Sequence, residues 1–316
     1  MAPRYLPRPV VAAAIAPMYR LALHEKLPVK TARLLLDKAA AGQVLPAGSV
    51  VRRLTLGGRP AERVTAGATE RPRAILYLHG GGYTLGSLAT HRSLTAFLAR
   101  EAAGVVFALD YRLAPEHPYP AALDDAVAAF LDVMNAQGFA ADQIAIAGDS
   151  AGGGLAVAAT RRLIDEYGVT PGALGLLSPW VDPSDESMPR SRDLVVNKAW
   201  GRRSAQQYRG SIDPATPGYA PLHGSLTGLP ATIVHVGAGE LLLPQIRRFA
   251  DQARAQGVEV VLDVLPTLWH SGHTQAGLVR EAAEATQQVG IFLRTRLDAH
   301  HRAGRTESGT VTGVSP

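Results

Sequence analysis

The chain contains no cysteine among its 316 residues, which excludes disulfide bonds, thiolate zinc sites and a cysteine nucleophile. No apolar run approaches the length that spans a bilayer, and no GK[ST] phosphate-binding loop occurs. The basic residues behind the formal net charge of +5 are scattered, whereas nucleic-acid binding needs them gathered in a stripe. We therefore expect no metal or other cofactor, no nucleic-acid partner, no stable membrane insertion and a cytoplasmic location.

An apolar segment at residues 10–18 follows Arg4 and Arg8 and faintly resembles a signal peptide. Pro7 and Pro9 directly precede the segment, charged helical sequence follows it, and no clear cleavage site is present. We therefore interpret residues 10–43 as two helices, broken near Leu27-Pro28. Their apolar side chains recur at helical spacing and could pack on a core or line an apolar pocket.

Strand and helix patterns alternate along the rest of the chain. Two alternating segments, 50–56 and 61–65, flank Gly57-Gly58 and predict an antiparallel hairpin. Near-continuous apolar strands separated by helices then predict a mostly parallel sheet, covered on both faces. The expected strands are 74–78, 105–109, 144–147, 174–177, 233–236 and 258–265, and the expected helices are 92–102, 121–135, 155–164, 243–256 and 275–297.

Two segments depart from this alternation. Residues 179–230 lose strand character apart from a helical stretch at 199–208, so we expect an excursion from the sheet that could cover a site. Residues 301–316 are expected to form a disordered tail. The resulting division is 1–45 for the N-terminal helices, 46–300 for one α/β domain, and 301–316 for the tail.

The pentapeptide Gly148-Asp149-Ser150-Ala151-Gly152 matches G-x-S-x-G between a predicted strand and a predicted helix, the context of a nucleophile elbow. Glycine at 148 and 152 permits the sharp turn and the close approach of strand and helix. Ser150 is then exposed at the edge of the sheet, above the positive end of the following helix. The alternative is a plain turn in which Ser150 merely caps the helix.

A serine nucleophile also needs oxyanion donors that are already in place. The run at 79–82 is His-Gly-Gly-Gly directly after a predicted strand, the type of loop that provides such donors in lipases and esterases. We expect donors from Gly81, Gly82 and Ala151. A dinucleotide site is disfavoured because Leu85 stands where G-x-G-x-x-G requires its third glycine. His79 is expected to be structural and, with Gly80, to support the loop.

The serine also needs a base and a group that orients the base, in the chain order Ser, Asp or Glu, His. Glu240 follows the predicted strand 233–236 beside small residues and is the best-placed acid. Asp251 and Asp263 are rivals, but the first falls inside a helix and the second inside a strand.

The base should follow the last strand. His270 is the first candidate in the loop after residue 265, and His273 is its competitor. His223 and His235 precede the acid and break the order.

With these pieces assembled, the sequence resembles the hormone-sensitive-lipase-like family of α/β-hydrolases, the bacterial carboxylesterases of family IV. The resemblance covers roughly residues 45–297, and Asp149 in the elbow is typical of the GDSAG branch, whose acid is often glutamate. Relatives commonly carry an aromatic residue where Gly272 stands, so the choice between His270 and His273 stays open. The shared stretches are HGGG at 79–82, DYRLAPEHPYPAALDD at 110–125, GDSAGG at 148–153 and SPWVD at 178–182.

The resemblance implies an α/β-hydrolase fold, with Ser150 as nucleophile, His270 as base, Glu240 as its orienter, and oxyanion donors from Gly81, Gly82 and Ala151. It also implies a helical cap at the N-terminus and pairing of two copies along the edge strand 258–265. The expected reaction is hydrolysis of short-chain carboxylic esters through an acyl-enzyme intermediate. Amide, lactone or acyl-transfer chemistry with the same triad is the near alternative, and a non-catalytic ligand-binding protein on this fold is the remoter one.

Overall fold

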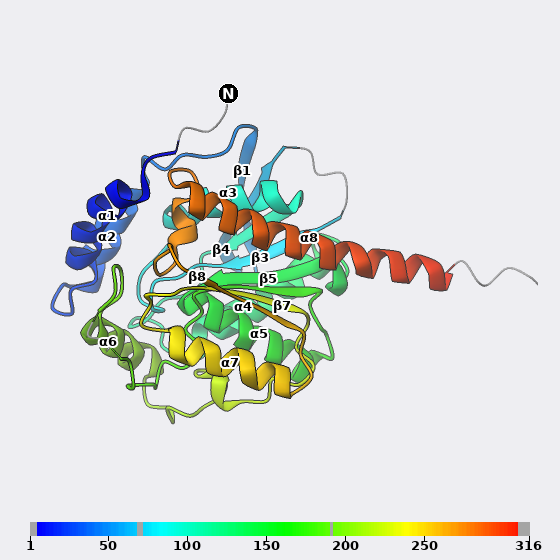
Figure 1. Ribbon diagram of the computed structural model, residues 1–316. Coiled ribbons are helices and arrows are strands. Elements are labelled where there is room, and N and C mark those ends of the chain that lie inside the picture. The colour runs from blue at the N-terminus through cyan, green and yellow to red at the C-terminus, as the bar shows by residue number, and fades with distance from the viewer. Residues whose placement is uncertain (1–4, 68–71, 190–191, 309–316) are drawn as a thin grey trace, which may run out of the picture.

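The computed structural model describes residues 5–67, 72–189 and 192–308 (Figure 1). Within this part of the chain, eight strands form one sheet in the order β1-β2-β4-β3-β5-β6-β7-β8. Its strands are β1 (Ser49–Leu56), β2 (Arg59–Ala66), β3 (Ala74–Leu78), β4 (Val105–Leu109), β5 (Ile144–Asp149), β6 (Ala173–Leu177), β7 (Thr232–Gly237) and β8 (Val260–Leu265).

The sheet is antiparallel only at its N-terminal edge. β1 pairs antiparallel with β2, and β2 pairs antiparallel with β4, while every pair from β4 to β8 is parallel. This arrangement confirms the predicted α/β-hydrolase architecture with an antiparallel edge hairpin. The last strand begins at Val260 and not at the predicted residue 258.

Helices cover both faces of the sheet, as Figure 1 shows. One face packs against α3 and α8, and the other packs against α4, α5 and α7. The helices are α1 (Arg8–Ala22), α2 (Val29–Ala40), α3 (Leu88–Ala102), α4 (Ala121–Asn135), α5 (Ala151–Tyr167), α6 (Lys198–Arg209), α7 (Leu243–Ala255) and α8 (Arg280–Ser308), with 3-10 turns η1 (Ala141–Gln143), η2 (Pro221–His223) and η3 (Gly272–Gln275).

The two faces explain why the central strands carry almost no polar residues. All five residues of β3 and all five of β4 are buried. A strand that is covered on both sides needs apolar side chains in both directions, and this requirement replaces alternation with a continuous apolar run. The sheet is thereby a rigid platform whose parallel strands end at one common edge.

The C-terminal segment differs from its prediction. Helix α8 continues to Ser308, so residues 301–308 are helical and the prediction of disorder from 301 is wrong for them. Their sequence contains Arg, Ala and Glu, which favour a helix, and one glycine is not enough to end it. The rest of the predicted tail, 309–316, lies outside the described residues.

Candidate active site

The strand-to-helix turn at Ser150 has the backbone of a strained elbow. Ser150 has φ 50° and ψ −120°, a conformation that costs a non-glycine residue roughly 1–3 kcal/mol. The turn is held because the Ser150 N–H donates to the carbonyl of Leu177 at 2.9 Å, while its carbonyl accepts from Trp180 N–H at 2.8 Å. A side chain on Gly152 would collide with the backbone carbonyls of Leu78 and His79, so the close packing of α5 on β3 requires glycine there.

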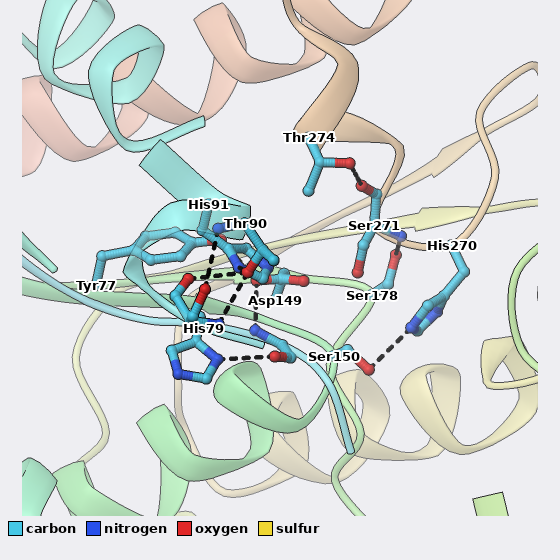
Figure 2. A network of polar contacts seen from close by, with 12 residues as sticks. Tyr77, His79, Thr90, His91, Asp149, Ser150, Ser178, His270, Ser271 and Thr274 are labelled. Atoms are coloured by element: carbon cyan, nitrogen blue, oxygen red, sulfur yellow. Dashed lines mark hydrogen bonds and ion pairs between the residues drawn. The ribbon is translucent and has the colours of Figure 1, made fainter. Parts of the chain in front are cut away.

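Ser150 is joined to two residues from the ends of later strands. His270 Nε2 lies 2.8 Å from Ser150 Oγ, and His270 Nδ1 lies 2.8 Å from Glu240 Oε2 (Figure 2 draws the first contact). Glu240 follows β7 and His270 follows β8, so the parallel sheet brings the three residues to its common edge. Ser150, Glu240 and His270 are all nearly fully buried.

The two hydrogen bonds of His270 fix which of its ring nitrogens carries the proton. Burial would lower the pKa of His270, but the hydrogen bond and the negative charge of Glu240 outweigh it and raise the pKa above its ordinary value. Because the Glu240 carboxylate faces Nδ1, the proton of the neutral imidazole resides there and the Nε2 lone pair faces Ser150 Oγ. This arrangement suits a base that takes the serine proton.

Ser178 connects the acid to the loop of the base. Its hydroxyl donates to Glu240 Oε1 at 2.8 Å and accepts from Ser271 N–H at 3.2 Å. The N–H of Gly237 also donates to Glu240 Oε1. Our sequence reasoning did not assign Ser178 a role, although it opens the SPWVD stretch at 178–182 that supports the family resemblance.

The glycine loop after β3 lies beside the serine. Gly81 has φ 121° and Gly82 has φ 61°, which is left-handed backbone that favours glycine. Among the described residues, the N–H groups of Gly81, Gly82 and Ala151 have no hydrogen-bond acceptor of the chain itself. They are therefore free to donate to a ligand atom.

His79 and Asp149 support this loop from below. The His79 ring is stacked on Tyr111 with centroids 4.3 Å apart, and its Nδ1 lies 2.8 Å from the Gly80 carbonyl. Burial lowers the pKa of His79 to about 3, with a further lowering from His91, so the ring is neutral at physiological pH. The position of His79 agrees with the structural role predicted for it.

Asp149 is a buried carboxylate at the centre of a polar network (Figure 2). It accepts hydrogen bonds from Tyr77 Oη at 2.8 Å and from Gly80 N–H at 2.9 Å, and His91 Nε2 lies 3.2 Å away. Burial would raise the pKa of Asp149, but His91 and the hydrogen bonds hold it well below its ordinary value. His91 is a site residue that the sequence reasoning missed, because nothing in its local pattern separates it from an ordinary helical histidine.

A cavity of about 300 Å³ opens onto Ser150 and His270. Its wall includes residues of helices α1 and α2, which lie in the segment 10–43 that is predicted to form a cap. The excursion at 179–230 also contributes, through Val195, Val196 and Trp200. The cap part of the wall is formed by Ile15, Met18, Tyr19, Leu23, Leu36, Ala39 and Ala40.

Polar side chains hold the two N-terminal helices in place over this cavity. Arg33 of α2 donates to the carbonyls of Thr84 and Ala114, both at 2.8 Å, and pairs with Glu116 at 2.8 Å. Asn197 Nδ2 donates to the Leu23 carbonyl at 2.7 Å. The cap helices are thus bonded to the loop after β3, to the 110–125 stretch and to the excursion.

The rival residues lie elsewhere. Asp251 is exposed on α7 and pairs with Arg254, and His223 contacts Asp182 at 3.2 Å. His273 does not reach Ser150; its Nε2 lies 3.1 Å from Nδ1 of His235. His270 is therefore the histidine of this loop that contacts the serine.

Two further features bear on other functions. The described part of the chain contains no group of three or more His, Cys, Asp or Glu side chains that could hold a metal ion. Nor does any helix within the described ranges combine the length and apolarity needed to cross a membrane.

Comparison with known proteins supports the same fold. A family model described as the alpha/beta hydrolase fold matches residues 75–274. The acetyl-hydrolase of Streptomyces hygroscopicus is 39% identical over 274 residues, which cover 84% of this chain and 90% of that protein. The putative acetyl-hydrolase LipR of Mycobacterium tuberculosis (strain ATCC 25618 / H37Rv) is 32% identical, with 86% of this chain and 89% of the relative covered.

Solved structures agree over nearly the whole chain. An esterase from the bacterial hormone-sensitive lipase (HSL) family superposes with a TM-score of 0.84 at 36% identity, covering 90% of this chain and 98% of that one. The esterase EstE5, in a crystal soaked with p-nitrophenyl butyrate, gives a TM-score of 0.82 at 32% identity, with coverage of 91% and 98%.

Proposed function

This chain belongs to the α/β-hydrolase fold family and, within it, to the bacterial hormone-sensitive lipase group, and on that premise we propose that it is a serine carboxylesterase that hydrolyses short-chain carboxylic esters through an acyl-enzyme intermediate. The observation that supports the proposal most strongly is the series of hydrogen bonds from Ser150 Oγ to His270 to Glu240, with both contacts of His270 at 2.8 Å. Ser150 and His270 line a cavity whose wall also includes the glycine loop.

In the first half-reaction, Ser150 Oγ attacks the ester carbonyl carbon while His270 Nε2 accepts the serine proton. The tetrahedral intermediate collapses as His270 returns that proton to the departing alkoxide, which leaves as the alcohol. In the second half-reaction, water attacks the acyl-serine, His270 accepts a proton from the water and returns it to Ser150, and the acid is released. Glu240 holds the imidazole in its tautomer and stabilises the imidazolium that forms twice in this cycle.

The negative charge on the carbonyl oxygen needs donors at both tetrahedral stages. We assign this role to the N–H groups of Gly81, Gly82 and Ala151, which find no acceptor within the described part of the chain. One such donor typically contributes about 10²–10³-fold to kcat. The positive end of α5, which begins at Ala151, adds to the stabilisation.

The preference for short acyl chains is supported by the size and cover of the cavity. About 300 Å³ lies at the lower end of the range for small-molecule sites, and the cap helices close one side. The names of two relatives, which describe acetyl-hydrolases, point the same way. We expect higher kcat/KM for p-nitrophenyl esters of C2–C6 acids than for C10–C16 esters, and the reverse order would contradict the preference.

The mechanism is tested by Ser150→Ala. We expect kcat for p-nitrophenyl butyrate to fall by at least about 10³-fold, because the acyl-enzyme cannot form. Ser211→Ala, at an exposed serine outside the site, is the matched control and should keep wild-type activity. Unchanged esterase activity in Ser150→Ala would refute the mechanism.

Rates on other acyl compounds define how far the activity extends. The same triad can attack amides and lactones, and an alcohol can replace water in the second half-reaction. We expect p-nitrophenyl butyrate to be hydrolysed faster than the matched anilide and lactone, and the acyl group to pass mainly to water when methanol is present. A faster anilide or a dominant methyl ester product would reassign the function.

We also propose that two copies pair along β8. This strand is at the edge of the sheet, bonded only to β7 among the described strands, and its residues are half-buried. An edge strand presents free N–H and C=O groups that a second strand can bond. Sedimentation velocity at micromolar concentration should give twice the chain mass, and a single-chain mass there would contradict the pairing.

A cytoplasmic location remains a prediction of the sequence. Fractionation of cells that express the chain with its own N-terminus would test it, because the activity should stay with the cytoplasmic fraction.

A further inference from the structure

Three residues that compete for roles in the triad lie in contact with one another, away from Ser150. His273 Nε2 lies 3.1 Å from His235 Nδ1, and His235 Nε2 lies 3.3 Å from Asp263 Oδ2. The last contact has the distance of an ion pair but not the full geometry of a hydrogen bond. We call His235 and His273 the inner histidine pair.

The sheet register places these groups together. His235 on β7 is the direct partner of Asp263 on β8, and Cβ atoms of such neighbouring residues point to the same face of a sheet. Ile233 lies two residues before His235, and Val261 lies two residues before Asp263, so both point to this same face. Because Ile233 and Val261 pack in one cluster with residues of α8, the face is the one that α8 covers. His273 reaches the pair from η3, which precedes α8.

The carboxylate selects the tautomers of both rings. A proton on His235 Nε2 faces Asp263, whereas a lone pair there would face a negative charge. His235 Nδ1 is then the acceptor, so His273 Nε2 must donate to it and His273 Nδ1 carries a lone pair. The contacts agree, since Nδ1 of His273 is buried with no partner among the described residues, a position that suits a lone pair better than an N–H.

The inner histidine pair is neutral at physiological pH. Burial lowers the pKa of His273 to about 3, with a further lowering from His235. Burial also lowers the pKa of His235 to about 4, and Asp263 offsets only part of that effect. A neutral pair with one proton between two nitrogens gives a directed hydrogen bond and no repulsion.

His273 belongs to the loop that carries His270. Ser271, between them, has φ 51°, a strained backbone for a serine. One restraint on this loop is the hydrogen bond from Ser271 N–H to Ser178 Oγ at 3.2 Å. The contact of His273 with His235 is a second restraint, and it ties η3 directly to β7.

We propose that His273 is a positioning residue for His270, held by His235, whose tautomer the Asp263 carboxylate selects. This inference rests on the proposed esterase function, because its effect is exerted on the base of that reaction. His273 is not a catalytic residue: its neighbours Ser271 and Thr274 line the cavity, while its ring is bonded to β7.

The kinetic test uses Asp263, whose side chain is 45% exposed in the single chain and lies on β8, the strand proposed to pair with a second copy. Asp263→Leu should lower kcat for p-nitrophenyl butyrate by about tenfold with KM within about twofold, because a displaced base loses alignment while the pocket is intact. Asp263→Asn, which keeps an acceptor oxygen, should stay within about threefold of wild type. Asp251→Leu makes the same change at an exposed carboxylate on α7 and should have no effect.

Sedimentation of each variant checks that its association state is unchanged. The proposal is overturned if Asp263→Leu keeps the kcat of wild type, or if it loses no more than Asp251→Leu does. If wild type itself has no esterase activity, the proposed function fails, and that outcome is distinct from an active wild type with an unaffected variant.

The second test needs no turnover. In the ¹⁵N-histidine-labelled protein, NMR should find His273 protonated at Nε2 and unprotonated at Nδ1. The His273 signals are assigned by their absence in His273→Phe. Asp263→Leu should shift these signals toward a mixture of tautomers, whereas Asp251→Leu should not. A wild-type His273 that is protonated at Nδ1 would overturn the tautomer assignment and with it the proposal.

Discussion

Asp149 Oδ1 accepts a hydrogen bond from the N–H of Gly80 at 2.9 Å, and this bond joins the residue before Ser150 to the first glycine of the loop at 79–82. The carboxylate is fixed in turn by Tyr77 Oη at 2.8 Å. The elbow and the loop are therefore one unit, although about seventy residues separate them. A charged acceptor of this kind makes hydrogen bonds roughly twice as strong as a neutral one does.

Gly80→Ala should damage the proposed oxyanion hole without removing a donor. A Cβ at position 80 would collide with the Asp149 carboxylate, so the loop must shift away from β5. Since a shift of about 1 Å can cost 10²-fold in rate, we expect kcat to fall by about 10–10²-fold with a smaller change in KM. Steady-state kinetics on p-nitrophenyl butyrate checks this. Gly58→Ala, at a glycine outside the site that has open space around it but a φ of 73°, is the control for the loss of stability that a glycine replacement causes.

His270→Ala and His273→Ala should differ sharply. We expect the first to lower kcat by at least about 10³-fold, because Ser150 loses the group 2.8 Å away that takes its proton. The second should lower kcat by only about tenfold, because it loosens the loop of the base. Both variants are measured side by side, with circular dichroism as the control for folding. Equal losses, or a larger loss in His273→Ala, would reverse the assignment of the base.

The pH profile of kcat/KM should show the raised pKa of His270. Only the neutral imidazole accepts the serine proton, so activity falls as pH drops through this pKa. Burial lowers the pKa, but Glu240 outweighs it, and the midpoint of the acid limb should lie above the ordinary histidine value of about 6.5.

Glu240→Gln serves as the matched variant for that profile. It removes the charge that raises the pKa, so the midpoint of its residual activity should move to lower pH, together with a large loss of kcat. A midpoint that stays in place would show that Glu240 does not control the protonation of His270.

Arg33→Ala should loosen the cap. It removes donors to two backbone carbonyls and the partner of Glu116, and hydrogen bonds to charged groups contribute about 1.5–3 kcal/mol each. We expect at least about tenfold faster hydrogen exchange in α2 and a higher KM, because α2 forms part of the cavity wall. Arg202→Ala breaks the exposed pair with Glu186 and is the control. Equal exchange rates in the two variants would contradict a specific role of Arg33.

The parts of the site that could be predicted from sequence are those built by local rules. The turn at Gly148–Gly152 is specified by glycines and by the strand before it, and the HGGG loop by its lack of side chains. Glu240 could be selected because it directly follows a strand, in the required chain order. For the same reason, the alternation of apolar strands with helices was enough to predict the fold.

Contacts across the sheet could not be predicted in this way. His270 and His273 both lie in the loop after the last strand, so the local sequence does not separate them as candidates for the base. Only the path of the loop brings His270 within 2.8 Å of Ser150, while His273 contacts His235. The pairing of His91 with Asp149 likewise joins helix α3 to strand β5. These partners are set by the packing of segments that are distant in the chain, and no periodicity records that packing.

The amino-acid sequence by itself therefore determined the turn at 148–152, the glycine loop at 79–82 and the position of Glu240 before His270, because each depends on the conformational requirements of a few adjacent residues. The tertiary structure alone decided which histidine meets Ser150, how the cap is bonded over the cavity, and that Asp263 lies beside His235. Those outcomes depend on the register of parallel strands, which brings the ends of separate segments to one edge of the sheet.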